Sequence, residues 1–224
     1  VTAESLSQLF LKAGQVLAAD RAQIQDVLAQ VRPWVLPSLL ELLTDTPDRG
    51  IRRGLLALLR SGDGVPASLL VPLLRDHRWF VVRNAVELAT VSRDETVMED
   101  LDRLTRHPEA QVRREVMRTL SALGGAKAAR FLARSLSDED ASVRVLAVSG
   151  LGRIGGPAHE AAVLAQINSR DFEARSPDEI GAFLNTYAVL GGERAVPLLD
   201  RLWRSKLFDS HPRPVRIAAV RALA

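Results

Sequence analysis

The sequence contains no cysteine and few aromatic residues, and each absence restricts what the chain can be. Without cysteine there can be no disulfide, no thiolate metal ligand and no cysteine nucleophile. Aromatic residues make up only 4% of the 224 residues, although 47% are hydrophobic, so the core must be built mainly from Leu, Val and Ala. Such a composition favours closely packed helices over a β-sandwich.

The chain also lacks a strong charge of either sign and any long apolar run. Its 30 basic and 27 acidic residues give a formal net charge of +3, and 27 of the 30 cations are arginine. This balance leaves only a mild preference for an anionic partner. The apolar runs are short and interrupted by charge, so we expect no membrane insertion. No signal peptide is visible, and we expect a cytoplasmic location.

One dipeptide recurs along the chain: a β-branched residue followed by arginine. The first four of these arginines are 31, 30 and 31 residues apart, and the last two are 72 apart, which is two units of 36. Self-similarity at a fixed period indicates a repeat array. The dipeptide occurs at Ile51-Arg52, Val82-Arg83, Val112-Arg113, Val143-Arg144 and Val215-Arg216.

Each repeat unit has the pattern of a helical hairpin. Residues 126–137 and residues 143–154 both carry apolar side chains at helical spacing. The acidic residues 138–140 separate the two segments, where they can cap the second helix and suit its dipole. Gly155 and Gly156 end the second helix, because glycine can adopt a positive φ.

A single hairpin cannot bury both of its apolar stripes, so successive hairpins must stack. We therefore predict an all-α fold: a right-handed α-solenoid (superhelix) of stacked antiparallel helical hairpins, with about six repeats. Both ends of the chain lie within a helical pattern without polar caps, so we expect a fragment of a longer protein. The expected parts are N-terminal helices over 1–32 that cap or continue the array, and an array over 33–224 with approximate units 33–64, 65–94, 95–125, 126–156, 157–192 and 193–224.

These units resemble HEAT repeats, an armadillo-like helical family, and specifically the short bacterial kind also called phycobilisome-lyase-like HEAT repeats. The resemblance implies that an aspartate at the hairpin turn pairs with the arginine that opens the second helix, as a ladder between adjacent units. The third unit has His107 in place of the aspartate, and the fifth has Ile180 in place of the arginine. The expected structural ladder residues are Asp45, Arg52, Asp76, Arg83, Arg113, Asp138, Arg144, Asp209 and Arg216.

The ladder arginines could be structural or could form a phosphate track. We favour the structural interpretation, because an arginine fork at each hairpin turn can satisfy the carbonyls and aspartates of the neighbouring unit. Other arginines should lie on the outward side of the second helices, where they are either solvated or form a thin basic stripe for an anionic partner. Asn84, Glu87 and Val145 interrupt that stripe, whose members are Arg53, Arg114, Arg118, Arg153 and Arg221.

Aromatic residues at polar positions are the remaining candidates for partner contact. Trp79 occupies a position that holds Asp48, Glu109, Asp140 or Pro212 in other units. Such an aromatic residue either covers the local turn at residues 75–78 or anchors an interface. The same two interpretations apply to Trp203 in the last unit, and the predicted aromatic contacts are Trp79, Phe80, Phe172 and Phe208.

No set of residues in the sequence predicts catalysis. His159-Glu160 resembles the His-Glu pairs of the HEAT-like deoxyhypusine hydroxylases, but one pair alone cannot supply the convergent ligands that a metal needs. No nucleophile–base set, P-loop or Rossmann fingerprint appears. We therefore predict no enzyme activity, no cofactor and no metal.

An extended array without catalytic residues favours a non-catalytic protein–protein interaction scaffold. The partner would be a protein or another domain, bound along the concave wall or the hairpin-turn surface. The first alternative is duplex DNA binding through a basic concave wall, as in the HEAT-like alkylpurine DNA glycosylases. It requires a strong positive field that a charge of +3 disfavours. The second alternative, which rests on the family name, is a bilin lyase or its helper.

Overall fold

The computed structural model describes residues 35–60, 64–90, 94–204 and 211–223. Throughout these ranges the regular elements are helices and none is a strand, so the predicted all-α class is confirmed. The expected N-terminal helices over 1–32 lie outside the described residues, as do Phe208 and Asp209. Among the helices described, none has the length and apolarity needed to cross a bilayer.

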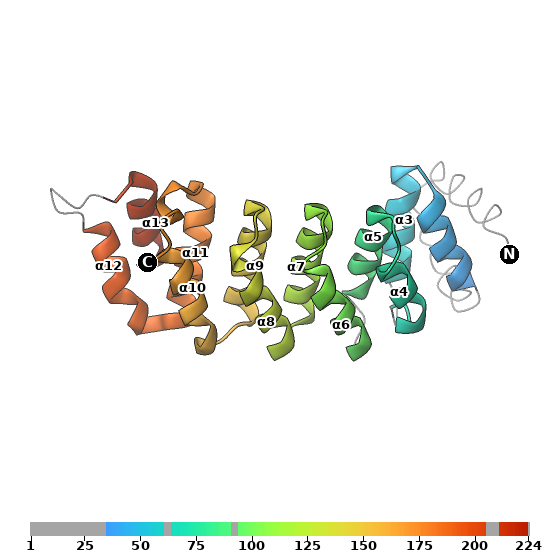
Figure 1. Cartoon of the computed structure of the whole chain (residues 1–224), viewed down its shortest axis with the longest axis horizontal. Coiled ribbons are helices and arrows are strands. Elements are labelled where there is room, and N and C mark those ends of the chain that lie inside the picture. The colour runs from blue at the N-terminus through green and yellow to red at the C-terminus, as the bar shows by residue number, and fades with distance from the viewer. Residues whose placement is uncertain (1–34, 61–63, 91–93, 205–210, 224) are drawn as a thin grey trace, which may run out of the picture. The chain divides into compact units, whose positions relative to one another are not determined.

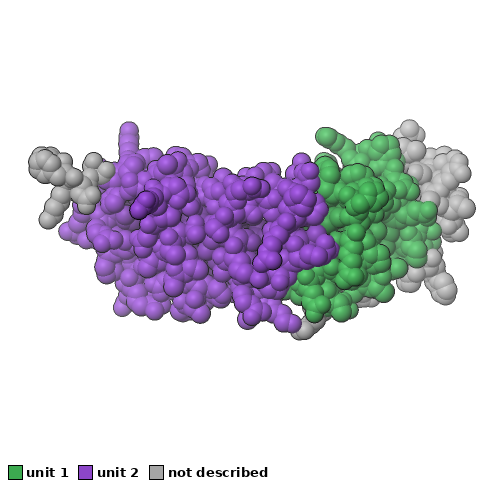
Figure 2. All heavy atoms as spheres, in the orientation of Figure 1, with its two compact units in different colours: residues 1–100 green, residues 101–224 purple. Residues whose placement is uncertain are grey.

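The chain divides into two compact units, residues 1–100 and residues 101–224 (Figure 2). In the first unit, α5 packs against both α3 and α4. The helix α6 (Glu95–Leu104) contains the boundary between the units. The other helices described in the first unit are a helix over 35–45, α3 (Arg49–Arg60), α4 (Ala67–Leu74) and α5 (Trp79–Ala89).

The second unit is a stack of helical hairpins (Figure 1). The pairs α8–α9, α10–α11 and α12–α13 form the hairpins, and the second helices α7, α9, α11 and α13 each pack against the next. This is the solenoid arrangement that the repeat period predicts. The helices are α7 (Ala110–Leu123), α8 (Gly125–Arg134), α9 (Ala141–Ile154), α10 (Glu160–Ile167), α11 (Pro177–Gly191), α12 (Val196–Trp203) and α13 (Arg213–Leu223). Short 3-10 turns occupy Ser135–Ser137, Pro157–His159, Phe172–Ala174 and Gly192–Ala195.

The valine of the recurring dipeptide begins the buried stripe of α7, α9 and α13. Val112, Val143 and Val215 are each fully buried. In α7 the stripe continues at helical spacing through Val116 and Leu120, which are also fully buried. Burial of an aliphatic side chain of this size stabilises the fold by about 1.5–3 kcal/mol. The arginine that follows the valine is thereby directed to the edge of the core.

The helix ends match the sequence only in part. Asp140 caps α9, because its carboxylate accepts a hydrogen bond from the amide of Val143 at 3.0 Å, as the acidic turn predicts. Gly124 ends α7 with a φ of 71°, which favours glycine. Gly155, by contrast, ends α9 with a φ of −75°. Glycine is needed there for space, since a Cβ would lie 2.5 Å from the carbonyl oxygen of Leu151.

Candidate protein-interaction surface

Arg113 at the start of α7 joins two successive hairpin turns. Its Nη1 donates to the carbonyl oxygens of His107 and Pro108, in its own turn, at 2.8 and 3.0 Å. Its Nε and Nη2 donate to both carboxylate oxygens of Asp138, in the next turn, at 2.9 and 3.0 Å. Nη2 also contacts Glu139 at 2.9 Å. Only 5% of the Arg113 side chain is exposed, so this ion pair is largely removed from water.

Arg144 at the start of α9 makes the same two kinds of contact. Its Nη1 donates to the carbonyl oxygens of Asp138 and Glu139 at 2.8 and 3.1 Å. Its Nε and Nη2 donate to the carboxylate of Glu179, in the first turn of α11, at 2.6 and 2.8 Å. Arg113 and Arg144 therefore each take carbonyls from their own turn and a carboxylate from the following repeat.

This geometry corrects the expectation that the turn aspartate and the arginine of one unit pair through their side chains. Asp138 directs its carboxylate to Arg113 of the preceding repeat and offers only its backbone carbonyl to Arg144. In the first unit, Arg52 donates to the carbonyls of Thr46 and Pro47, both at 2.9 Å. The reason is positional: Nη1 of each arginine donates to the carbonyls five and six residues earlier, so the backbone of its own turn occupies that side of the guanidinium.

In the first unit, Asp45 and Asp76 both lie next to Arg78 and not next to the arginines Arg52 and Arg83 with which they were predicted to pair. Arg78 lies 3.5 Å from the carboxylate of Asp45 and 3.0 Å from that of Asp76. Its guanidinium holds the pKa of Asp76 below the usual range. Arg83 instead donates to the side-chain oxygen of Asn84 at 2.8 Å.

The proposed basic stripe on the second helices largely has internal partners. Arg114 binds both oxygens of Asp140 of the next repeat, at 3.1 and 2.5 Å. This contact lowers the pKa of Asp140 to about 2. Arg118 pairs with Glu115 at 2.8 Å, and Arg153 donates to the hydroxyl of Ser121. The remaining members, Arg53 and Arg221, are exposed on α3 and α13.

The aromatic candidates lie in different environments. Trp79 is half-buried at the start of α5, and Phe80 beside it is 40% exposed. The two rings meet edge to face with centroids 6.1 Å apart, and the Arg78 guanidinium lies 5.9 Å from the Phe80 ring centroid. The pair thus partly covers its own turn and partly faces solvent. Trp203 on α12 is 40% exposed.

Phe172 corrects a prediction, since it belongs to the core and is not available to a partner. Only 2% of it is exposed, and its ring meets Phe183 edge to face at a centroid distance of 6.0 Å. The guanidinium of Arg175 lies 5.7 and 5.3 Å from the centroids of these two rings. The long turn of this unit folds back, which places its one aromatic residue between the helices and not in solvent.

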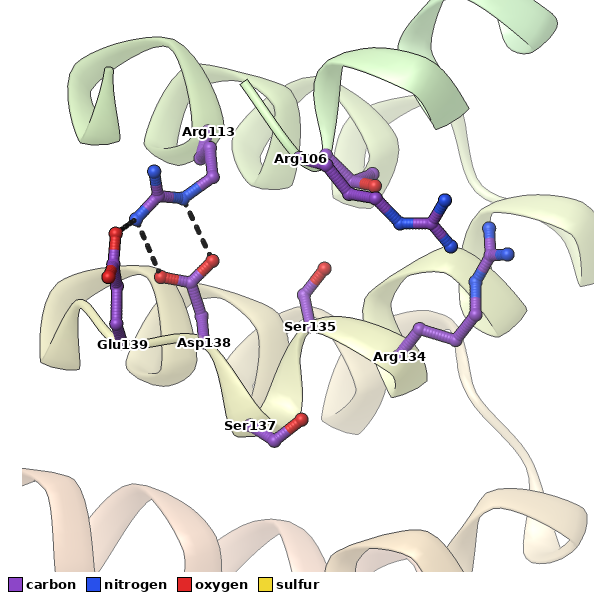
Figure 3. A pocket seen from close by; sticks show the side chains of 8 residues that line it. Arg106, Arg113, Arg134, Ser135, Ser137, Asp138 and Glu139 are labelled. Carbon is purple, nitrogen blue, oxygen red and sulfur yellow. Dashed lines mark hydrogen bonds and ion pairs between the residues drawn. The ribbon is translucent and has the colours of Figure 1, made fainter. Parts of the chain in front are cut away.

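A polar pocket of about 400 Å³ opens between the hairpin turns of two successive repeats (Figure 3). The side chains of Arg106 and Arg134 approach each other there from the two turns. Arg134 pairs with Asp102, whereas Arg106 has no side-chain partner among the residues described. The sequence pattern revealed neither arginine as a candidate, because neither belongs to the Val-Arg dipeptide. The pocket is lined by Thr105, Arg106, Arg113, Arg134, Ser135, Ser137, Asp138 and Glu139.

His159 and Glu160 make separate contacts. The Nδ1 atom of His159 accepts a hydrogen bond from the amide of Gly156 at 3.4 Å, and Glu160 pairs with Arg194 at 2.7 Å. In the described part of the chain, no three or more His, Asp or Glu residues are grouped so that they could hold a metal ion.

Comparison with known proteins finds a similarity to HEAT repeats in part of this chain. A model of HEAT repeats matches residues 99–177, and no curated protein sequence matches the chain. A designed armadillo repeat protein is similar at 18% identity and a TM-score of 0.47, with 84% of this chain and 98% of that one covered. An engineered protein is similar at 19% identity and a TM-score of 0.44. The match covers 84% of this chain and 56% of the length of that protein. Human deoxyhypusine hydroxylase in complex with glycerol is similar at 16% identity and a TM-score of 0.40, with 96% of this chain and 95% of that one covered.

At these TM-scores the solved structures support no conclusion about function. The family match covers the repeats whose ladder contacts involve Arg113, Asp138 and Arg144. Residues 99–177 of this chain are therefore similar to HEAT repeats, in agreement with the resemblance that the Val-Arg period and the hairpin pattern indicate.

Proposed function

We propose that this protein is a non-catalytic scaffold that binds a partner protein at the hairpin-turn edge of its second unit. The observation that carries this proposal is the pocket in which Arg106 and Arg134 approach each other from successive turns (Figure 3). An edge formed by consecutive turns offers several side chains at regular spacing to one extended segment. A cytoplasmic location stays part of this proposal.

The hairpin-turn edge is a better candidate than the wall of second helices. Arg114, Arg118 and Arg153 on that wall already contact Asp140, Glu115 and Ser121. A partner anion would have to compete with these groups. Arg106 has no such competitor among the described side chains and is exposed. Because a guanidinium can bind a carboxylate through two parallel hydrogen bonds, the partner segment should carry an acidic residue.

The two alternatives draw less support. Duplex DNA needs a strong positive field along the wall, and the carboxylates paired with Arg114 and Arg118 reduce it. Negligible affinity for duplex DNA at low salt would dispose of that function. An absorbance titration with bilin that shows no shift would dispose of the lyase function.

Affinity capture with the 224-residue chain tests the scaffold proposal. We expect a partner that is retained by the wild-type chain and lost from an Arg106→Glu variant, because charge reversal repels the acidic segment. Arg201→Glu, at an exposed position of α12, is the matched control and should retain the partner. Trp79→Ala tests the aromatic contact separately. A set of bound proteins identical for the wild-type chain and Arg106→Glu would contradict the proposed surface.

A further inference from the structure

The pocket between the turns of Arg106 and Arg134 has a wall of polar side chains (Figure 3). Arginine, serine, threonine, aspartate and glutamate supply every residue described around its volume of about 400 Å³. Because no aliphatic or aromatic residue belongs to that wall, an acyl chain has nothing to pack against and an aromatic ring has nothing to stack on. A polar, charged group therefore fits this pocket best.

The carboxylates of the wall are engaged by Arg113 and not by Arg106. Both oxygens of Asp138 accept hydrogen bonds from Arg113 at 2.9 and 3.0 Å, and Glu139 lies 2.9 Å from the same guanidinium. Arg106 is exposed, and no side chain in the described ranges pairs with it. The guanidinium of Arg106 is therefore available to a ligand.

Arg134 is held in place as a second binding group. Its Nη2 donates to the carboxylate of Asp102, and its guanidinium lies 4.9 Å from the ring centroid of Phe131. These contacts orient the side chain, although 46% of it stays exposed. In Figure 3 its guanidinium approaches that of Arg106 from the neighbouring turn. Two cations that approach each other repel, so an anion bound between them would relieve the repulsion.

Geometry and charge favour a phosphate ester over a carboxylate as that anion. A carboxylate has two oxygens in one plane and binds one guanidinium fork through two parallel hydrogen bonds. A phosphate ester has three terminal oxygens and a charge of about −1.5 to −2 at pH 7, so it can bond to two forks that approach from different sides. It also competes better with Asp102 for Arg134, because a dianion attracts a cation more strongly than a monoanion does.

We propose that this pocket binds a phosphorylated serine or threonine of the partner segment, with the phosphate held between Arg106 and Arg134. The inference rests on the scaffold function proposed above and names the group that the hairpin-turn edge recognises. A nucleotide, a phospholipid or a phosphotyrosine fits less well, since its base, acyl chains or ring would lie against polar side chains. Clustered arginines are a recurring means of recognising phosphorylated peptide motifs.

Fluorescence anisotropy with defined peptides tests the proposal. The probe is a fluorescein-labelled peptide of glycine and alanine with one central phosphoserine, and its matched controls carry glutamate or unmodified serine at that position. We expect the 224-residue chain to bind the phosphoserine peptide saturably, and about tenfold or more tightly than the glutamate peptide. The serine peptide should show no saturable binding.

Two variants of the protein connect binding to the pocket. Arg106→Gln should weaken binding of the phosphoserine peptide by about tenfold or more, because it removes one of the two forks. Arg201→Gln, at an exposed position of α12, is the matched control and should leave binding unchanged. Since Arg106 pairs with no described side chain, its replacement should preserve the helices, and circular dichroism checks this.

The possible results separate this inference from the scaffold function. A glutamate peptide that binds as tightly as the phosphoserine peptide, and that Arg106→Gln releases, would reject the phosphate and leave an acidic segment as the ligand. Inorganic phosphate or adenosine monophosphate that binds more tightly than the phosphoserine peptide would reject a peptide ligand. The proposal is also overturned by the absence of saturable binding up to about 1 mM peptide, or by equal binding to the wild-type chain and Arg106→Gln.

Discussion

Arginines on the second helices differ in burial. The guanidinium of Arg113 is 5% exposed and reaches two carbonyls and two carboxylates. Arg53 and Arg221 belong to the same residue type but remain in solvent. A planar fork with five donors suits the first environment, and lysine would not replace it there. Arg113 reaches its carboxylates because the following repeat brings Asp138 and Glu139 to it.

Replacement of Arg113 by methionine tests this ladder contact. Methionine keeps the apolar stem but leaves Asp138 without its partner in a largely buried site. We expect the free energy of unfolding to fall by about 3–5 kcal/mol, the usual cost of removing one member of a buried pair. Urea unfolding measures it. Arg53→Met at an exposed position should change stability by less than about 0.5 kcal/mol. Equal effects of the two substitutions would contradict a structural ladder.

The Arg114–Asp140 pair should make stability depend on pH. Contact with Arg114 holds the pKa of Asp140 at about 2 in the folded state, below the value of about 3.9 in an unfolded chain. A lowered folded pKa means that the contribution is fully present above about pH 4 and is lost as the pH falls toward 2. Since 34% of Arg114 and 21% of Asp140 are exposed, solvent screening limits the contribution to about 1–2 kcal/mol.

Asp140→Asn measures this contribution. The wild-type chain should be more stable than the variant by that amount in urea unfolding at pH 6, and the difference should shrink at pH 3. A difference that stays constant between the two pH values would assign it to the capping contact with Val143 and not to the charge.

Among the elements, α9 depends on two glycines that let its neighbours approach. A Cβ at Gly150 would lie 2.9 Å from the Leu132 side chain on α8 and 3.0 Å from the hydroxyl of Ser121 on α7. A Cβ at Gly152 would lie 3.2 Å from the hydroxyl of Thr186 on α11. Glycine costs a helix about 1 kcal/mol of propensity relative to alanine, so its presence at both positions reflects packing between repeats.

Alanine substitution at two helical glycines separates packing from propensity. Gly150→Ala should destabilise the fold by about 1–2 kcal/mol, because overpacking against two helices outweighs the gain in propensity. Gly181→Ala on α11 is the matched control, since nothing lies within 4 Å of its added Cβ. It should stabilise the fold by about 0.5–1 kcal/mol. Thermal unfolding of the two variants should shift in opposite directions, and equal shifts would reject close approach at Gly150.

In the second unit as a whole, the tertiary contacts are made between neighbouring repeats. The second helices each pack against the next, and ladder bonds join residues of adjacent turns. In such an array, stability is close to a sum of repeat terms and nearest-neighbour interfaces. A protein with one globular core, by contrast, should unfold as a whole when one of its layers is removed.

Removal of residues 193–224 tests this additivity. The shortened chain should keep the helices up to α11 and lose the circular dichroism signal of α12 and α13. It should also unfold at a lower urea concentration, because Leu184 and its neighbours on α11 lose the cover of α13. A complete loss of helical signal would indicate a globular core and contradict a repeat array.

The sequence determined the local pattern of this protein. A valine every thirty or so residues, followed by arginine, is enough to predict a buried stripe, a hairpin and an all-α stack, because helical spacing is a property of neighbouring residues. The same reasoning placed an acidic cap of α9 within residues 138–140, and Asp140 provides it. Prediction failed where a side chain is long or a turn is irregular, as at Phe172, which the turn folds inward.

Only the tertiary structure decided which carboxylate each arginine meets. The partner of Arg113 is 25 residues away and that of Arg144 is 35 away, in repeats whose turns differ in length. No periodic pattern along one helix specifies such a contact, because it depends on how two hairpins stack. The approach of Arg106 and Arg134 across one pocket arises in the same way, from a surface that forms only when two repeats lie side by side.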